Sequence, residues 1–285
     1  MNSKVLACID HSNFTPGVCD YAAWAAVRLA APLEFIHILD RRQETAPMRD
    51  LSGSIGLGAQ EALLEDLSVL DENRGKIAQE SGRLLLEAAK QRAVAAGVPA
   101  PEARKRHGDL VETLVEIEQD ARMFVLGKRG ETGESAPQHI GSNLERVIRA
   151  VHRPILIVPK EFQAPRNFLI AFDGSKTTRK GVEMIASSPL FRGLACHILM
   201  VDTESPASIG QLEWAKYTLA NAGFSVTASI IAGNAETVIA EYERTNQIDL
   251  LVMGAYGHSR IRHLLVGSTT TAMIRTSSIP LLLLR

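Results

Sequence analysis

Two segments of this chain are near copies of each other, and this internal repeat limits the possible folds more than any other feature. Residues 4–12 read KVLACIDHS and residues 167–175 read NFLIAFDGS, so each is an apolar run that ends in Asp-x-Ser. Each half also closes on a proline followed by an apolar run, at 154–158 and 280–284. Repetition on this scale is typical of a duplicated structural unit. The sequence therefore predicts two domains, a first unit over residues 1–160 and a second unit over 161–285.

Within each unit, apolar runs alternate with stretches of helical periodicity. Continuous apolar runs of this length are typical of parallel strands that are covered on both faces. The expected strands are 4–9, 33–39, 102–106, 122–126 and 154–158, then 167–172, 194–201, 224–231, 249–253 and 280–284. The expected helices begin at 15, span 59–96 and 109–120, begin again at 142, and then span 177–187, 207–222, 235–246 and 268–277. This order predicts an α/β fold: two repeated, doubly wound, five-stranded parallel-sheet domains of Rossmann-like type.

The first unit differs from the second by an extra segment over about residues 41–75. Gly75 and Gly82 lie within the helical pattern 59–96 and leave open whether it forms one unbroken helix.

A glycine-rich loop near the end of each unit carries the main functional signal. In the second unit, Gly254 and Gly257 follow an apolar strand, and Gly267-Ser268 opens a helix after nine further residues. Helix N-termini present unpaired N–H groups and the positive end of the helix dipole, which suits phosphate. One isolated loop of this kind is weak evidence, because glycine-rich loops are common. Here the loop joins a strand to a helix, occurs twice, and each copy accompanies an aspartate at a strand end, Asp10 or Asp173.

On these residues the chain resembles a tandem universal stress protein with two UspA-like domains. The glycine spacing of the second unit fits the ATP-binding signature of that family, G-x2-G-x9-G-(S/T). The resemblance implies that ATP, ADP or AMP binds there, with Asp173 at the adenosine end and Met200 offering backbone bonds to adenine. It further implies contacts to ribose and phosphates. The implied site residues of the second unit are Asp173, Met200, Met253, Gly254, Gly257, Gly267, Ser268 and Thr269. No Walker A lysine is present, which leaves further charge neutralisation to Mg²⁺ or water.

The first unit departs from that signature, because ten residues rather than nine separate Gly130 from Gly141. Its loop also carries Glu131 and Glu134, which would repel phosphate unless they point away. The resemblance implies a second, less well preserved site. Its residues are Asp10, Ile38, Gly127, Gly130, Gly141, Ser142 and Asn143.

Composition excludes several other functions. The net charge of −1 gives no reason to expect nucleic acid as a partner. No apolar run reaches the roughly 18–20 residues that span a bilayer, and the chain starts on a strand rather than a signal peptide. Three cysteines without a CxxC motif favour the cytoplasm. No His/Cys cluster has metal-ligand spacing, so no metal site is expected.

Three functions remain open: a nucleotide-binding stress or signalling module that acts through its conformation or an unknown protein partner, a slow ATPase, and a scaffold without a ligand. A general base for ATP hydrolysis is not apparent, so the sequence names no catalytic residue.

The two terminal apolar runs also suggest how the units assemble. In the family that the chain resembles, final strands commonly pair across a two-fold interface. We therefore expect residues 155–158 and 281–284 to pair within one chain as a pseudo-dimer, because unpaired apolar strand edges are otherwise prone to aggregate. A homodimer of the whole chain is left open.

Overall fold

The computed structural model describes residues 3–39, 57–130, 142–255 and 267–285. Strands and helices alternate through both units. The strands are β1 (Lys4–Cys8), β2 (Leu33–Leu39), β3 (Glu102–His107), β4 (Ala121–Gly127), β5 (Ile155–Val158), β6 (Asn167–Ala171), β7 (Ala195–Met200), β8 (Val226–Ile230), β9 (Leu251–Gly254) and β10 (Leu281–Leu284). The helices are α1 (Thr15–Leu29), α3 (Leu57–Ala95), α4 (Leu110–Glu116), α5 (Ser142–Ala150), α6 (Lys176–Ser187), α7 (Pro206–Asn221), α8 (Ala235–Thr245) and α9 (Ser268–Thr276). Short 3-10 turns follow α4 at Glu118–Asp120 and α6 at Pro189–Phe191.

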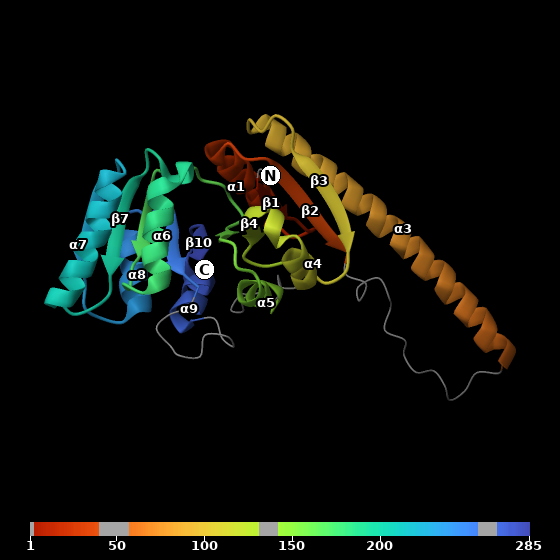
Figure 1. Ribbon diagram of the computed structural model, residues 1–285. Coiled ribbons are helices and arrows are strands. Elements are labelled where there is room, and N and C mark those ends of the chain that lie inside the picture. The colour runs from red at the N-terminus through yellow and green to blue at the C-terminus, as the bar shows by residue number, and fades with distance from the viewer. Residues whose placement is uncertain (1–2, 40–56, 131–141, 256–266) are drawn as a thin grey trace.

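All ten strands form one sheet, in the order β3-β2-β1-β4-β5-β10-β9-β6-β7-β8. Figure 1 shows this sheet running through the whole molecule. Every neighbouring pair is parallel except β5 and β10, which pair antiparallel with Leu282 opposite Leu156. The expected pairing of the two terminal strands is therefore confirmed. The two predicted five-stranded units are therefore confirmed, and the backbone hydrogen bonds between β5 and β10 join them into one ten-stranded sheet.

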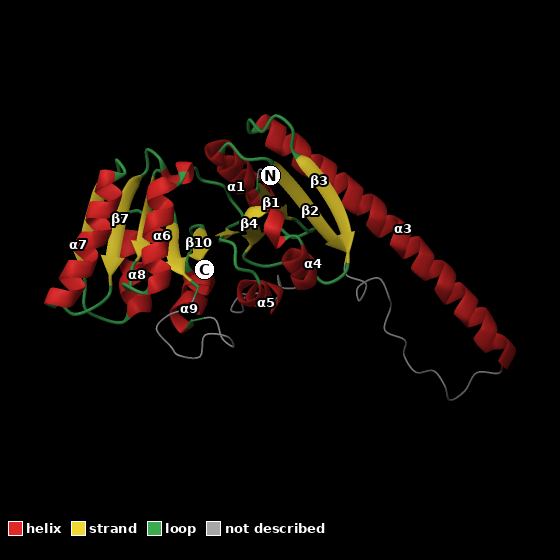
Figure 2. Ribbon diagram, viewed as in Figure 1, coloured by secondary structure: helices red, strands yellow, loops and turns green. Residues whose placement is uncertain are grey.

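Helices cover both faces of the sheet (Figure 2), as the continuous apolar strands predict. One buried cluster joins the sheet to residues of α1, α3, α6 and α7, and a second joins its other face to residues of α4, α5, α8 and α9. Successive residues of a strand point to opposite faces, so Val5 and Ala7 belong to the first cluster and Leu6 to the second. Each face of the sheet therefore has a core that is shared by the two units.

Helix α3 is a single helix of 39 residues, which settles the question that Gly75 and Gly82 left open. Its packed face consists of Gly82, Leu86, Ala89 and Ala93. Gly82 lies directly over the His37 ring, since a Cβ at this position would lie 2.7 Å from His37 Cδ2. In Figure 1, the end of α3 that begins at residue 57 extends well beyond the sheet. The described part of the extra segment 41–75 therefore belongs to this helix.

Helix α4 is shorter than expected and ends at Glu116 rather than near residue 120. Residues Glu118–Asp120 tighten into a 3-10 turn. The Glu118 carboxylate accepts a hydrogen bond of 2.8 Å from the Arg153 backbone N–H, which lies just before β5. The helix thus ends just before a residue that bonds a distant part of the chain, which local periodicity does not show.

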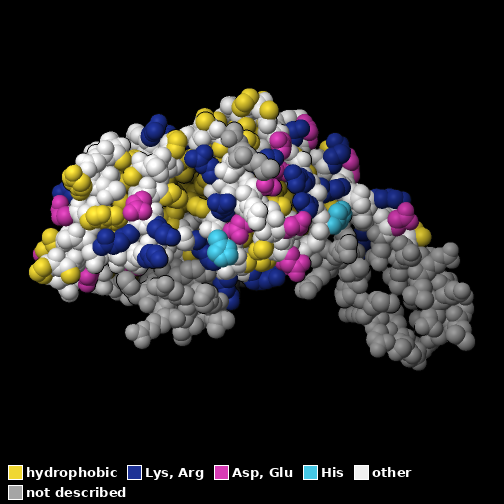
Figure 3. Space-filling model, in the orientation of Figure 1, with side chains coloured by type: hydrophobic (Ala, Val, Ile, Leu, Met, Phe, Trp, Pro, Cys, Tyr) yellow, Lys and Arg dark blue, Asp and Glu magenta, His cyan; other side chains and the backbone are white. Residues whose placement is uncertain are grey.

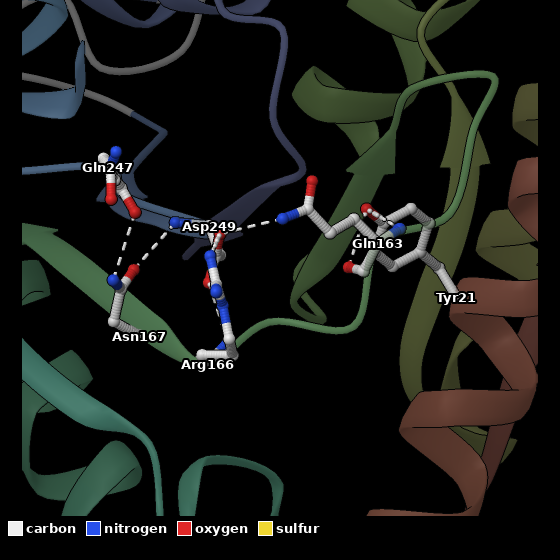
Figure 4. Close-up of polar contacts among 6 residues, drawn as sticks. All are labelled: Tyr21, Gln163, Arg166, Asn167, Gln247 and Asp249. Carbon is white, nitrogen blue, oxygen red and sulfur yellow. Dashed lines mark hydrogen bonds and ion pairs between the residues drawn. The ribbon is translucent and has the colours of Figure 1, made fainter.

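The linker between the units is held from both sides (Figure 4). The Tyr21 hydroxyl of α1 bonds both backbone groups of Gln163, at 3.3 Å to the oxygen and 3.2 Å to the nitrogen. The Asp249 carboxylate, buried beside the start of β9, accepts from the Arg166 backbone N–H at 2.9 Å, from Arg166 Nε at 3.1 Å and from Gln163 Nε2 at 3.3 Å. A cavity of about 380 Å³ lies beside this network. The linker is therefore part of the packed structure.

On the face shown in Figure 3, basic and acidic side chains are interspersed over both units. Among the described helices, none is both long and apolar enough to cross a bilayer.

Candidate functional site

Asp173 follows β6, at the edge of the sheet where β6, β7 and β9 end. Its Oδ1 accepts hydrogen bonds from the Ser175 backbone N–H at 3.0 Å and from the Thr178 hydroxyl at 2.7 Å. Ser175 is the N-cap of α6 and accepts from the Thr178 N–H. The carboxylate is thus oriented by the first turn of the helix that follows it.

Gly174 lets the backbone turn sharply after Asp173. Its φ is +70°, and a Cβ there would lie 1.6 Å from Gln211 Oε1 of α7. The left-handed backbone favours glycine, and a Cβ there would also require the Gln211 side chain to move. The turn therefore brings α7 into contact with the chain immediately after Asp173.

Gly254, the last residue of β9, lies next to the Asp173 turn. Strands β6 and β9 are adjacent and parallel, with Ala171 opposite Met253. Asp173 and Gly254 come two and one residues after this pair, so the sheet brings them to the same edge. Parallel strands that carry their helices on opposite faces bind ligands at such an edge.

The two described ends of the second glycine loop are tied together. The Thr270 hydroxyl donates to the Gly254 carbonyl oxygen at 3.0 Å, and the Gly267 N–H donates to the Ala255 carbonyl at 3.3 Å. Helix α9 thus begins directly beside the end of β9. Its N-cap, Gly267, provides no side-chain hydrogen bond to the first turn, unlike Ser175 in α6, Ser205 in α7 and Asn234 in α8.

The remaining predicted residues of the second unit differ in their surroundings. Met200 and Met253 are buried at the ends of β7 and β9, and the Met200 carbonyl accepts the Ile231 N–H at 3.0 Å. Ser268 is exposed and Thr269 half-buried at the start of α9. Gly257 lies outside the described residues.

The first unit has a comparable arrangement. The Asp10 Oδ1 accepts from the Ser12 N–H at 3.0 Å, as Asp173 does from Ser175. Gly130 lies against this carboxylate, since a Cβ there would lie 2.9 Å from Asp10 Oδ2. Gly127 ends β4 and packs against Phe14, where a Cβ would lie 2.7 Å from the Phe14 Cβ. The structure thus brings Asp10 and Gly130 together.

Helix α3 packs beside the first site. The Ser81 hydroxyl lies 3.2 Å from Nε2 of His11, the residue after Asp10. Gly82 packs on His37, the residue before the half-buried Ile38. Ser142 begins α5, and Asn143 is exposed and accepts from Arg146 at 3.3 Å. Gly141 lies outside the described residues.

Sequence reasoning missed an aromatic group beside Asp173. Phe172 and Trp214 of α7 stack with their ring centroids 6.3 Å apart, and the Arg179 guanidinium lies 4.7 Å from the Trp214 ring centroid. The position of Trp214 near the end of β6 depends on how α7 crosses the sheet, which no local sequence pattern predicts.

Sequence reasoning also missed a lysine that joins the units. Lys128 follows Gly127 in the first loop, and its ammonium donates to the Ser277 carbonyl oxygen at the C-terminus of α9. Burial and the nearby Arg129 lower the pKa of Lys128 to about 8, against the attraction of Glu243. Burial raises the pKa of Glu243 to about 7, although a Ser277 hydrogen bond and Lys128 act in the opposite direction.

Among the described residues, no group of three or more His, Cys, Asp or Glu side chains could hold a metal ion.

The fold and the paired strand-end sites define a tandem, doubly wound α/β protein. Comparison with known proteins then identifies its family. The family model for the universal stress protein family matches residues 1–159 and 199–285. The universal stress protein Slr1230 of Synechocystis sp. is 39% identical over 285 residues, which covers 99% of both chains. This chain belongs to the universal stress protein family and contains two copies of its fold.

Solved structures agree at the level of the fold. A crystal structure of a universal stress protein from Archaeoglobus fulgidus superposes with a TM-score of 0.66 at 18% identity, covering 99% of this chain and 96% of that one. Another solved structure is a universal stress protein in complex with cAMP. It matches 43% of this chain and 98% of its own length at 21% identity, with a TM-score of 0.37.

Proposed function

We propose that the second unit binds an adenine nucleotide, ATP or its products ADP and AMP, and that the protein acts in stress response or signalling through the conformation or partner binding that this nucleotide controls. The observation that carries the proposal is the junction of β9 and α9. Gly254 has no side chain, Thr270 ties it to the helix, and Gly267, the N-cap of α9, offers no side-chain hydrogen bond to the first turn. Unpaired N–H groups beside a glycine are the arrangement that phosphate requires.

The adenosine end of the ligand would lie at Asp173, across the same edge from Gly254. The Asp173 carboxylate is already oriented by Ser175 and Thr178, so it can accept hydrogen bonds from ribose hydroxyls without reorganisation. Met200, Met253, Gly257, Gly267, Ser268 and Thr269 complete the proposed site. The first unit is proposed as a second site of the same kind, around Asp10, Ile38, Gly127, Gly130, Gly141, Ser142 and Asn143.

Nucleotide content tests the proposal directly. The purified protein is denatured and its supernatant analysed for ATP, ADP and AMP, and the nucleotide-free protein is titrated with each by calorimetry. Binding is expected, with G267V abolishing most of it, because a valine side chain would crowd the start of α9. Absence of both bound and titratable nucleotide would contradict the proposal and favour a ligand-free scaffold. Turnover of labelled ATP, compared with that of G267V, separates a binding protein from a slow ATPase.

A further inference from the structure

The helices that open the two proposed phosphate sites are both held, at their other ends, by a cation from the opposite unit. In the second unit this helix is α9, and the Lys128 ammonium of the first unit donates to the carbonyl of Ser277, the C-cap that follows the last helical residue. In the first unit this helix is α5. The Arg285 guanidinium, which follows β10, donates to the Ile148 carbonyl and, at 3.1 Å, to the Arg149 carbonyl. The contacts are reciprocal and hold equivalent helices, although Lys128 follows β4 and Arg285 follows β10, which are different positions in the repeat.

The chemistry of these contacts is that of a helix C-terminus. The last carbonyls of a helix have no partner within the helix and lie at the negative end of its dipole, so a cation there is favourable. Ser277 is buried, and Lys128 is itself largely removed from water. A buried charge-assisted hydrogen bond resists displacement more than an exposed one.

The positions of these cations connect the two sites. Lys128 lies between Gly127 and Gly130, so its backbone belongs to the loop of the first site. Its side chain ends on α9, whose opposite end carries Gly267 and Thr270 of the second site. A helix of nine residues is only about 13 Å long and moves as one piece. A change in the first loop that moves Lys128 would therefore act on the start of α9 and on its bond to Gly254.

We propose that Lys128 and Arg285 are positioning residues that act across the unit boundary: Lys128 sets the placement of α9 in the second site, and Arg285 that of α5 in the first, so the ligand affinity of each site depends on the other unit. This inference rests on the proposed nucleotide binding. It goes beyond that function, because it makes the pair of sites one coupled system rather than two independent copies. Coupling between sites is reciprocal by thermodynamic necessity.

The chain contains two tryptophans, one in each unit, which makes the inference testable one site at a time. Trp214 lies beside the Asp173 turn, so in a W24F background tryptophan fluorescence reports on the second unit alone. In that background K128M is expected to weaken ATP binding about 5- to 10-fold, in the usual range of coupling between sites. K128R keeps a donor and a charge and is expected to restore most of the affinity.

The matched control is R28M. Arg28 of α1 also donates across the boundary, at 2.6 Å from its Nε to the Leu190 carbonyl, but that carbonyl belongs to the 3-10 turn after α6 and not to α9. R28M removes a contact of the same kind and is expected to leave ATP affinity unchanged. If K128M and R28M bind ATP as the parent protein does, the positioning role is wrong. If both weaken binding equally, the effect is general loosening and the inference is also wrong.

A measurement without nucleotide keeps this test separate from that of the proposed function. Amide hydrogen exchange of α9 is expected to accelerate in K128M and not in R28M. If the parent protein binds no nucleotide, the proposed function fails, and the α9 exchange still decides whether Lys128 positions the helix. Unchanged exchange in α9 would overturn the positioning role whether or not nucleotide binds.

Discussion

Thr270 and Gly254 are joined by a hydrogen bond of 3.0 Å that spans the base of the second glycine loop. Thr270 is buried, and the hydroxyl and carbonyl meet where the strand ends and the helix begins. The bond fixes the distance between the first and last described parts of the loop, so it bears on both stability and ligand binding.

Replacement of this threonine by valine preserves shape and removes the donor. We expect T270V to lose about 1–2 kcal/mol of unfolding free energy, because it leaves the Gly254 carbonyl without this partner. ATP affinity should fall as well, because α9 is no longer tied to β9. Thr218 makes a similar bond of 2.8 Å to the Trp214 carbonyl within α7. The Trp214 carbonyl keeps its backbone N–H partner within α7, so T218V should change stability less than T270V and leave affinity unchanged. Equal affinities for the two variants would contradict the role given to Thr270.

Gly174 provides a second test, because a close counterpart has the same backbone but open surroundings. Gly174 and Gly193 have φ of +70° and +76°, but only Gly174 has a neighbour, Gln211, at the position of a Cβ. An alanine at either position costs about 1–2 kcal/mol for the left-handed backbone. G174A should cost more than G193A by urea unfolding and should also weaken nucleotide binding beside Asp173. Equal losses would show that Gln211 moves aside freely.

Alanine substitutions at two glycines of α3 should change the stability of the protein in opposite directions. Gly75 has nothing within 4 Å of a Cβ, whereas Gly82 has His37 Cδ2 at 2.7 Å. Alanine is favoured over glycine in a helix interior by about 1 kcal/mol. We therefore expect G75A to raise the melting temperature and G82A to lower it, as α3 is pushed off β2. A stabilising G82A would show that α3 does not pack on His37 as described.

The Glu243 carboxyl predicts a loss of stability as pH rises toward neutrality. Burial raises its pKa in the folded protein to about 7, above the ordinary 4.5. The resulting stabilisation is complete below pH 4.5 and is lost as pH rises through 7, because the unfolded chain releases this proton first. The raised pKa of Glu243 contributes at most about 3 kcal/mol to the free energy of unfolding.

Urea unfolding between pH 5 and 7.5 measures this effect. E243Q should flatten the decline in unfolding free energy over that range, because glutamine does not titrate. Glu241 is exposed on the same helix, so E241Q should leave the pH profile of the parent protein unchanged. If the unfolding free energy of the parent protein does not fall relative to that of E243Q between pH 5 and 7, the raised pKa of Glu243 is wrong.

Local sequence patterns predicted most of the fold. The predicted ranges overlap all ten strands of the described residues, although β3 reads EARKRH and is not an apolar run. Asp109, where the predicted helix 109–120 begins, caps α4 with side-chain hydrogen bonds. Errors arose where distant residues decide the structure. Helix α4 ends just before Glu118, which bonds Arg153, and the contact of Gly82 with His37 depends on where α3 crosses β2. Neither contact produces a repeating pattern in the sequence.

The candidate site shows the same division. Glycine spacing and strand-end aspartates predicted a nucleotide site in each unit, and that assignment stays a prediction. The structure brings Asp173 to the same sheet edge as Gly254, and Gly130 against Asp10. The contacts of Lys128 with Ser277 and of Gln211 with Gly174 could not be predicted, since each joins residues far apart in the sequence through the placement of whole helices.

The antiparallel pairing of β5 with β10 has a consequence for how the molecule could be built. Both strands belong to the centre of the sheet, and each is completed by the opposite unit. The same architecture could therefore be assembled from two separate polypeptides, one ending after β5 and one starting before β6. In a single chain, the peptide linker raises the effective concentration of one half at the other, while the paired strands set how the halves face each other.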